Sequence, residues 1–380
     1  MIAIHPDYAL IGKNFRILRR PYIVVEKGII KKITDEPPKS GQILTFQDCV
    51  LVPGFVNCHT HIGDAFAKEK AYGLPLEKAV APPNGLKHRL LRSTPRDKII
   101  SGMISACKEM LANGIVCFCD FREGGLEGIK IIKDALAHVK IRAVILGRPN
   151  SDPPEKILKY ANGIGLSSLN KYSTEELIEI SKICMQNKKI FAFHGSETIR
   201  QREKSFNLYS KSDIMRALEL PYVSFIVHAT HISENEIIEL NKRKIKVIIC
   251  PRANAYFGVG VPNISLMMKY NIIGGIGTDN VFANSPSLFK EFDFIVRLAR
   301  IQNTVIDPRE LLALATWKGF ETLNLVGGII DIGFPADFFL FDLSKPNVTH
   351  VEDIIKAIVL RGESSNIIAT FIQGEIVYEK

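Results

Sequence analysis

The sequence predicts an α/β protein: an eight-stranded parallel (β/α)8 TIM barrel that carries a small β-sandwich built from both ends of the chain. Three observations predict this fold. Segments with helical and strand-like periodicity alternate from about residue 99. Both flanks, residues 1–50 and 326–380, show short strand patterns with Gly and Pro turns and no pattern long enough for a helix. Histidines and one aspartate follow the ends of four predicted strands.

Length and composition agree with this division. The chain has 380 residues, of which 46% are hydrophobic and 23% charged, as in globular proteins. A barrel of this kind needs about 250 residues, which leaves room for a smaller second module. We therefore predict a barrel over 51–325 and a β-sandwich made of 1–50 and 326–380.

The barrel elements follow one another as pairs of a helix and a strand. For example, "KIISGMISACKEMLANG" has apolar residues at helical spacing and ends at Gly114, and the short apolar run "IVCFCD" follows it. Similar pairs recur along the chain. Eight strands are predicted, near 53–59, 115–120, 141–147, 163–168, 190–194, 223–228, 246–250 and 274–279.

The flanking segments read as β-structure at each end, as in "FRILRRPYIVVEKGIIKKITDEP" and "GGIIDIGFPADFFLFDLSK". Each flank is too short to bury a sheet alone, so we expect the two to pair with each other. Residues 62–95, after the first barrel strand, lack a single period. They are either a lid over the substrate or an ordinary connecting loop.

Several classes of protein are disfavoured. The start of the chain lacks the pattern of a secretory peptide and no apolar run is long enough for a membrane span, so we expect a cytoplasmic protein without membrane contact. The seven cysteines are expected to be reduced. The net charge of +9 is scattered rather than gathered in a patch, which argues against nucleic acid as a partner and favours a small-molecule substrate. Homo-oligomerisation is left open.

Metal-binding side chains lie at the ends of predicted strands. His59 and His61 end strand one, His194 ends strand five, His228 ends strand six and Asp279 ends strand eight. Side chains two apart on a strand share a face, so His59 and His61 can reach one point on the barrel axis. With His194 and Asp279 they form a set of three nitrogens and one oxygen that suits zinc or iron and leaves a position for water.

The carboxylate of Glu197 follows His194 by three residues. It is either a proton shuttle between water and substrate or an ordinary surface glutamate. A single histidine at a strand end is more often a packing group than a ligand, and His231 is a weaker candidate because it lies past its strand. The coincidence at four strand ends is what favours a catalytic metal.

The motifs "PGFVNCHTH", "FAFHGSE", "IVHATH", "CPRAN", "GIGTDN" and "GGIIDIGFPADFFLFDL" resemble, in this order, the landmarks of the amidohydrolase superfamily. The resemblance is to the branch of cytosine, guanine and S-adenosylhomocysteine deaminases, often labelled chlorohydrolase-like. It implies a distorted barrel with a β-sandwich from both termini and one divalent metal ion. The implied metal ligands are His59, His61, His194 and Asp279.

The resemblance also implies hydrolytic deamination of an aminated purine or pyrimidine base, nucleoside or related heterocycle. Hydroxide formed at the metal attacks the ring carbon and ammonia leaves. Asp279 accepts the water proton, Glu197 protonates the ring nitrogen and His228 orients the attacking oxygen. Zinc is the expected ion, with Fe²⁺ or Mn²⁺ as alternatives. Members of the superfamily with two metals commonly bridge them with a carboxylated lysine from strand four. Here strand four ends in serines, and Lys171 lies several residues beyond, so one metal is favoured.

Three further residues follow strand ends and are candidate substrate contacts: Arg148, Glu123 and Asn254. Arg148 can bind a carboxylate or phosphate, or form a salt bridge on the barrel rim. Two other functions stay open. One is hydrolysis of a cyclic amide or another C–N bond in the same fold, and the other is a non-catalytic, basic binding protein.

Overall fold

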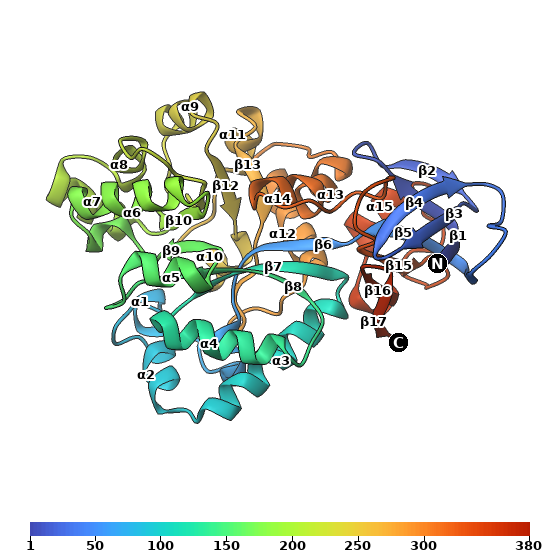
Figure 1. Cartoon of the computed structure of the whole chain (residues 1–380). Coiled ribbons are helices and arrows are strands. Elements are labelled where there is room, and N and C mark those ends of the chain that lie inside the picture. The colour runs from blue at the N-terminus through green and yellow to red at the C-terminus, as the bar shows by residue number, and fades with distance from the viewer.

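The computed structural model describes all 380 residues and contains two sheets (Figure 1). A nine-stranded sheet in the order β13-β12-β11-β10-β9-β8-β7-β6-β14 has only parallel neighbours and curls into the barrel. An eight-stranded sheet contains strands from both ends of the chain. The predicted fold class, a TIM-type α/β barrel with a terminal β-module, is confirmed.

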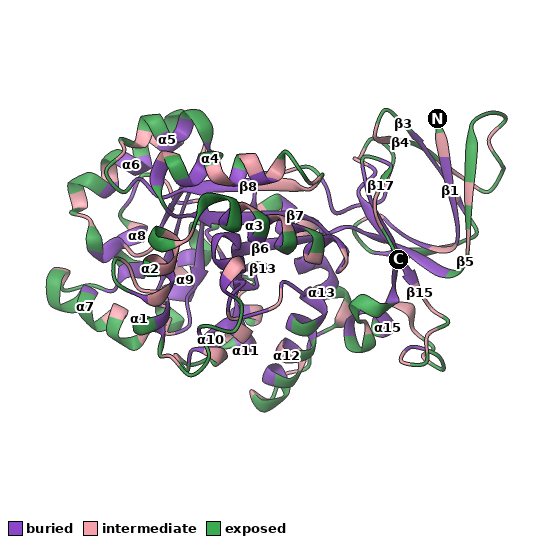
Figure 2. Cartoon of the chain, turned by 90° about the horizontal axis from the view of Figure 1, so that it is seen from below, coloured by how far each residue is buried: buried purple, intermediate pink, exposed green.

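The barrel strands are almost entirely buried, because side chains fill the inside of the barrel and helices cover its outside (Figure 2). Their bounds are β6 Phe55–His61, β7 Ile115–Arg122, β8 Arg142–Gly147, β9 Gly163–Leu166, β10 Ile190–Gly195, β11 Phe225–His228, β12 Lys246–Ile249, β13 Ile273–Ile276 and β14 Asp279–Asn280.

The eighth barrel strand is broken, although the sequence predicts one continuous strand over 274–279. Gly277 N donates to Ile249 O on strand seven at 2.9 Å, and Thr278 N donates to His59 O on strand one at 3.0 Å. The chain therefore crosses from one neighbour to the other between β13 and β14. This crossing closes the barrel and gives Asp279 a separate short strand paired with β6.

The outer helices follow the strands in the alternation that the sequence predicts. Ser173 and Ser233 form capping boxes with Glu176 and Glu236, which fix the starts of two of them. The helices are α3 Arg96–Leu111, α4 Gly125–Leu136, α5 Pro154–Tyr160, α6 Thr174–Gln186, α7 Ile199–Tyr209, α8 Asp213–Leu218, α9 Glu234–Lys242, α10 Pro251–Tyr256, α11 Ile264–Lys269, α12 Leu288–Ile301, α13 Pro308–Ala315 and α14 Trp317–Thr322.

The terminal sheet joins the two ends of the chain through antiparallel pairing of β5 with β15, in which Leu51 lies opposite Leu340. Figure 1 shows this sheet at one side of the barrel, with both termini in it. Its strands are β1 Ile2–Ile11, β2 Arg16–Arg19, β3 Tyr22–Glu26, β4 Ile29–Thr34, β5 Gln42–Pro53, β15 Phe338–Asp342, β16 Ile367–Ile372 and β17 Glu375–Glu379.

One prediction for the C-terminal flank is wrong. The sequence predicts no helix in residues 326–380, but α15 spans Ile354–Arg361. Its buried residues Ile355, Ile358 and Val359 belong to the main barrel core, and it packs against α12 and α13. Six of its eight residues, in the run "IIKAIVLR", are apolar, so the run shows no helical period that would distinguish it from a short buried strand.

Residues 62–95 fold into short helices: η1 Ile62–Ala67, α1 Leu76–Ala79 and α2 Leu86–Ser93. Two other short 3₁₀ helices are η2 Leu169–Lys171 and η3 Ser364–Asn366. All seven cysteines are buried and free, as predicted. None of the helices combines the length and apolar character that crossing a membrane requires.

Candidate metal centre

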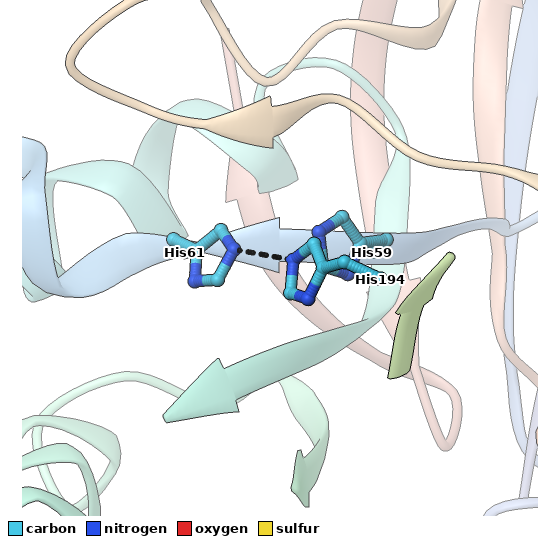
Figure 3. A group of neighbouring side chains, drawn as sticks. All are labelled: His59, His61 and His194. Carbon is cyan, nitrogen blue, oxygen red and sulfur yellow. Dashed lines mark hydrogen bonds between the residues drawn. The ribbon is translucent and has the colours of Figure 1, made fainter. Parts of the chain in front are cut away.

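Four predicted metal ligands converge at the carboxyl ends of the barrel strands. Figure 3 shows the rings of His59 and His61, both on β6, beside the ring of His194 on β10. The two Nε2 atoms of His61 and His194 are 3.3 Å apart. Asp279 Oδ1 lies 3.4 Å from His59 Nε2 and 3.5 Å from His61 Nε2. The structure thus brings together all four residues that the sequence selected.

Backbone carbonyls orient two of these rings. His61 Nδ1 donates to Phe121 O at 3.0 Å, and His194 Nδ1 donates to Leu166 O at 2.9 Å. Because a carbonyl only accepts, each Nδ1 carries the hydrogen and each Nε2 presents its lone pair to the centre.

The position of Asp279 depends on a close approach between the backbones of strand eight and strand one. A Cβ on Gly277 would lie 2.7 Å from the Cβ of His59, so strand eight can pass beside strand one only with glycine there. Asp279 itself has φ of 59°, in the left-handed region that non-glycine residues rarely adopt. Such strain is common where a side chain must be aimed at a functional site.

The protonation states suit metal binding. Burial lowers the pKa of His59 to about 3, and burial with the neighbouring imidazoles lowers the pKa of His194 well below its ordinary value. Both rings are therefore neutral at physiological pH. Burial opposes ionisation of Asp279, but His59, His228 and His61 outweigh it and lower the pKa of this carboxyl.

The residues fit a divalent cation. Both nitrogens of His59 and Asp279 Oδ1 are buried without a hydrogen-bond partner, which is costly unless a ligand satisfies them. Four ligands about 2.1 Å from one ion in a tetrahedron are about 3.4 Å apart. The separations of 3.3, 3.4 and 3.5 Å match this spacing. This donor set suits zinc and accommodates iron.

Two predicted proton-handling residues lie beside the four ligands. His228 Nε2 is 3.7 Å from Glu197 Oε1. Asn254 Nδ2 donates to His228 Nδ1 at 3.2 Å, which leaves the ring hydrogen on Nε2, facing Glu197. Burial raises the pKa of Glu197, against the pull of His228, so this carboxyl holds its proton more strongly than an exposed glutamate does.

The other two candidate substrate contacts differ in their surroundings. Glu123 lines the cavity, but its carboxylate lies 2.9 Å from His61 Nδ1 and also pairs with Lys87 and Arg122. Burial alone would raise the pKa of Glu123, yet these three cationic or imidazole groups hold it well below its usual range. Arg148 also lines the cavity, and it forms no salt bridge.

Sequence reasoning missed a buried ionic network behind His61. Its members share almost complete burial: Asp64, Lys87, Asp120, Arg122 and Glu123. Asp120 and Arg122 end strand two in "IVCFCDFR", so the same strand-end argument that selected the histidines could have found them. Lys87 carries no such signal, because it reaches the network from α2 in the aperiodic segment.

Residues of the candidate metal centre line a cavity of about 340 Å³. His61, His194, Glu197 and Asp279 line its inner part. Residues of the 62–95 segment, including Leu76, Val80 and Pro82, line its mouth. This volume suits a small organic ligand.

The profile of the amidohydrolase family matches residues 50–377 of the chain. An uncharacterized protein of Methanocaldococcus jannaschii is 38% identical over 94% of this chain and 95% of its own length. A protein of Thermococcus kodakarensis named 5-methylthioadenosine/S-adenosylhomocysteine deaminase is 22% identical over 99% of this chain and 93% of its own.

Among solved structures, a crystal structure of an adenosine deaminase from Xanthomonas campestris with bound zinc superposes with a TM-score of 0.85. The two are 18% identical, and the match covers 99% of this chain and 92% of the other. This similarity shows that the two chains share a fold.

Proposed function

The chain belongs to the amidohydrolase family, and we propose that it is a metal-dependent hydrolase that deaminates an aminated purine, pyrimidine or related heterocycle. The observation that carries this proposal is the convergence of three imidazoles and one carboxylate, with Glu197 and His228 beside them in one cavity. The deaminase names of a relative and of a structural neighbour support the reaction class.

His59, His61, His194 and Asp279 would hold one divalent ion. A bound divalent ion lowers the pKa of a coordinated water from 15.7 to about 7, which supplies a nucleophile at neutral pH. The proposal takes zinc as the ion, because the site has the zinc donor set and the structural neighbour contains zinc.

Residues of the chain itself then accept and donate the protons. The carboxylate of Asp279, kept ionised by its imidazole neighbours, accepts the proton that the attacking water loses. Glu197 delivers a proton to the ring nitrogen next to the reacting carbon, and His228 donates a hydrogen bond from Nε2 to the incoming oxygen. Asp279 then passes its proton to the amino group and Glu197 regains a proton from the added hydroxyl, so that the C–N bond breaks, a carbonyl forms with oxygen from water and the nitrogen leaves as ammonia.

The test is ammonia release from a panel of aminated bases, nucleosides and nucleotides, using protein loaded with zinc, iron or manganese and checked by elemental analysis. Glu197→Gln should keep the metal and lower turnover about 100-fold or more. Glu203→Gln, an exposed residue of α7, is the matched control and should change neither. Protein that binds no metal and releases no ammonia would refute the proposal. Hydrolysis of cyclic amides without ammonia would favour the other C–N hydrolase.

A further inference from the structure

Arg148 is a buried cation without a protein partner. It follows β8, its exposed fraction is only 7%, and its Nε is buried with no hydrogen-bond acceptor. Its guanidinium makes no ion pair with any carboxylate in the chain, although Glu123 is close enough to affect it electrostatically. Desolvating an unpaired guanidinium costs several kcal/mol, so an anion bound in the cavity that Arg148 lines would stabilise this side chain.

Two further cations without carboxylate partners line the same cavity. Lys171 lies in η2 after β9, and Lys204 lies on α7. Both are exposed, and neither forms a salt bridge. Burial, Arg148 and Lys204 together lower the pKa of Lys171 to about 8, as expected for cations gathered around one space.

The remaining charges of the cavity are matched within the protein. Lys87 pairs with Glu123 and lies 3.7 Å from Asp64. Arg200 lies 3.4 Å from Glu77. Glu197 and Asp279 belong to the metal centre. The lining of the cavity therefore keeps three positive charges without a carboxylate partner, those of Arg148, Lys171 and Lys204.

We propose that Arg148, Lys171 and Lys204 bind the phosphate group of a phosphorylated, aminated heterocyclic substrate while its ring lies at the metal centre. This inference rests on the proposed deaminase function and names the substrate class. One ligand can meet both regions, because the three cations and the metal-centre residues His61, His194 and Asp279 line one continuous cavity.

Charge favours phosphate over carboxylate. A phosphate monoester carries about −1.5 to −2 at pH 7 and offers three acceptor oxygens, whereas a carboxylate carries −1. Three unpaired cations match the phosphate, and the planar fork of Arg148 suits its oxygens. S-adenosylhomocysteine, for which the Thermococcus relative is named, has a carboxylate and no phosphate. 5-Methylthioadenosine, the other compound in that name, has no phosphate either, so the proposed substrate differs from both.

The kinetic test compares nucleoside 5′-monophosphates, the parent nucleosides and S-adenosylhomocysteine by ammonia release from the zinc-loaded enzyme. We expect kcat/KM for the preferred monophosphate to exceed that of its nucleoside by about 100-fold or more, since each charge-assisted contact contributes about 10- to 100-fold. Equal kcat/KM values for the two, or a preference for S-adenosylhomocysteine, would overturn the phosphate site and leave the deaminase function intact.

Variants test whether Lys171 and Lys204 cause the preference for the monophosphate. Lys171→Met with Lys204→Met should reduce the preference for the monophosphate at least about 10-fold. The control pair Lys182→Met with Lys188→Met, two exposed lysines outside the cavity, should leave it unchanged. Equal loss in both pairs would mean general surface attraction and would contradict the proposal.

Arg148→Met tests whether Arg148 binds the ligand or has a structural role. Removing an unpaired buried charge should leave the melting temperature of ligand-free protein unchanged or raise it, while the preference for the monophosphate is lost. A lower melting temperature with the preference retained would show that Arg148 is structural.

A binding measurement tests the phosphate site independently of the deamination reaction. Calorimetry with ribose 5-phosphate, which has no amino group to lose, should detect binding to the wild type and weaker binding to the double lysine variant. Binding without ammonia release from any compound would support the phosphate site and refute deamination. No binding of ribose 5-phosphate to the wild type would overturn the site.

Discussion

Glu123→Gln tests whether the buried ionic network behind the metal centre is a structural requirement. The carboxylate of Glu123 has a side-chain exposure of 5% and pairs with Lys87 and Arg122, each 2% exposed. Glutamine keeps the size of the side chain but removes its charge. Two desolvated cations then lose their shared partner, so the folded state is destabilised.

The magnitude follows from the partners that remain. Breaking a buried pair by removing one member costs about 3 to 5 kcal/mol. Lys87 Nζ still lies 3.7 Å from Asp64, and Arg122 still lies 3.5 Å from Asp120. These secondary contacts offset part of the loss, so we expect about 3 kcal/mol. Glu123 also lies 2.9 Å from His61 Nδ1, so metal affinity should fall about 10- to 100-fold.

The assay is urea unfolding of metal-free protein, which separates folding stability from metal binding, followed by metal competition with a chelator. Glu109→Gln is the control, because Glu109 pairs with Lys68 at the surface and should cost less than about 1 kcal/mol. Adding Lys87→Met to Glu123→Gln removes one stranded cation and should restore part of the stability. A loss below about 1 kcal/mol for Glu123→Gln, or strictly additive effects of the two changes, would refute this reasoning.

Three other changes test separate parts of the structure. His59→Ala should lower metal occupancy in elemental analysis, and an unchanged metal content would remove His59 from the ligand set. Gly277→Ala places a Cβ 2.7 Å from the His59 Cβ, so unfolding free energy should fall by about 1 to 3 kcal/mol and metal affinity with it, as urea unfolding and chelator competition would measure. Burial raises the pKa of Glu291 to about 7, against the pull of Arg252. Because the folded pKa is raised, the stability that this carboxyl contributes is full below its unfolded pKa of about 4.5 and is lost as pH rises through about 7. Glu291→Gln should therefore reduce the fall in urea midpoint between about pH 5 and about pH 8, and an unchanged fall would contradict that pKa.

The barrel could be predicted because its pattern is local. Buried parallel strands are short apolar runs, and helices between them show their own period, so each element is visible without its neighbours. The predictions failed where local pattern was weak or misleading. Helix α15 is a short, nearly continuous apolar run without a helical period, and the break in strand eight depends on hydrogen bonds to two different strands.

The convergence of the candidate metal ligands could be predicted because barrel topology brings strand ends together. Once His59, His194 and Asp279 are assigned to strand ends, the shared carboxyl face of a parallel barrel implies that they meet. Their rotamers, tautomers and separations could not be obtained this way, because those depend on carbonyls such as Leu166 O that lie on other strands.

The sequence by itself predicted the alternation of strands and helices in the barrel, the pairing of the two chain ends and a set of candidate metal-binding side chains, since these follow from periodicity and from residue type at strand ends. Only the tertiary structure decided which charges are paired. Lys87 on α2 pairs with Glu123, which follows β7, whereas Arg148 is buried without an acid. Electrostatic partnership depends on distances of a few ångströms between residues far apart in the chain, and no local pattern encodes those distances.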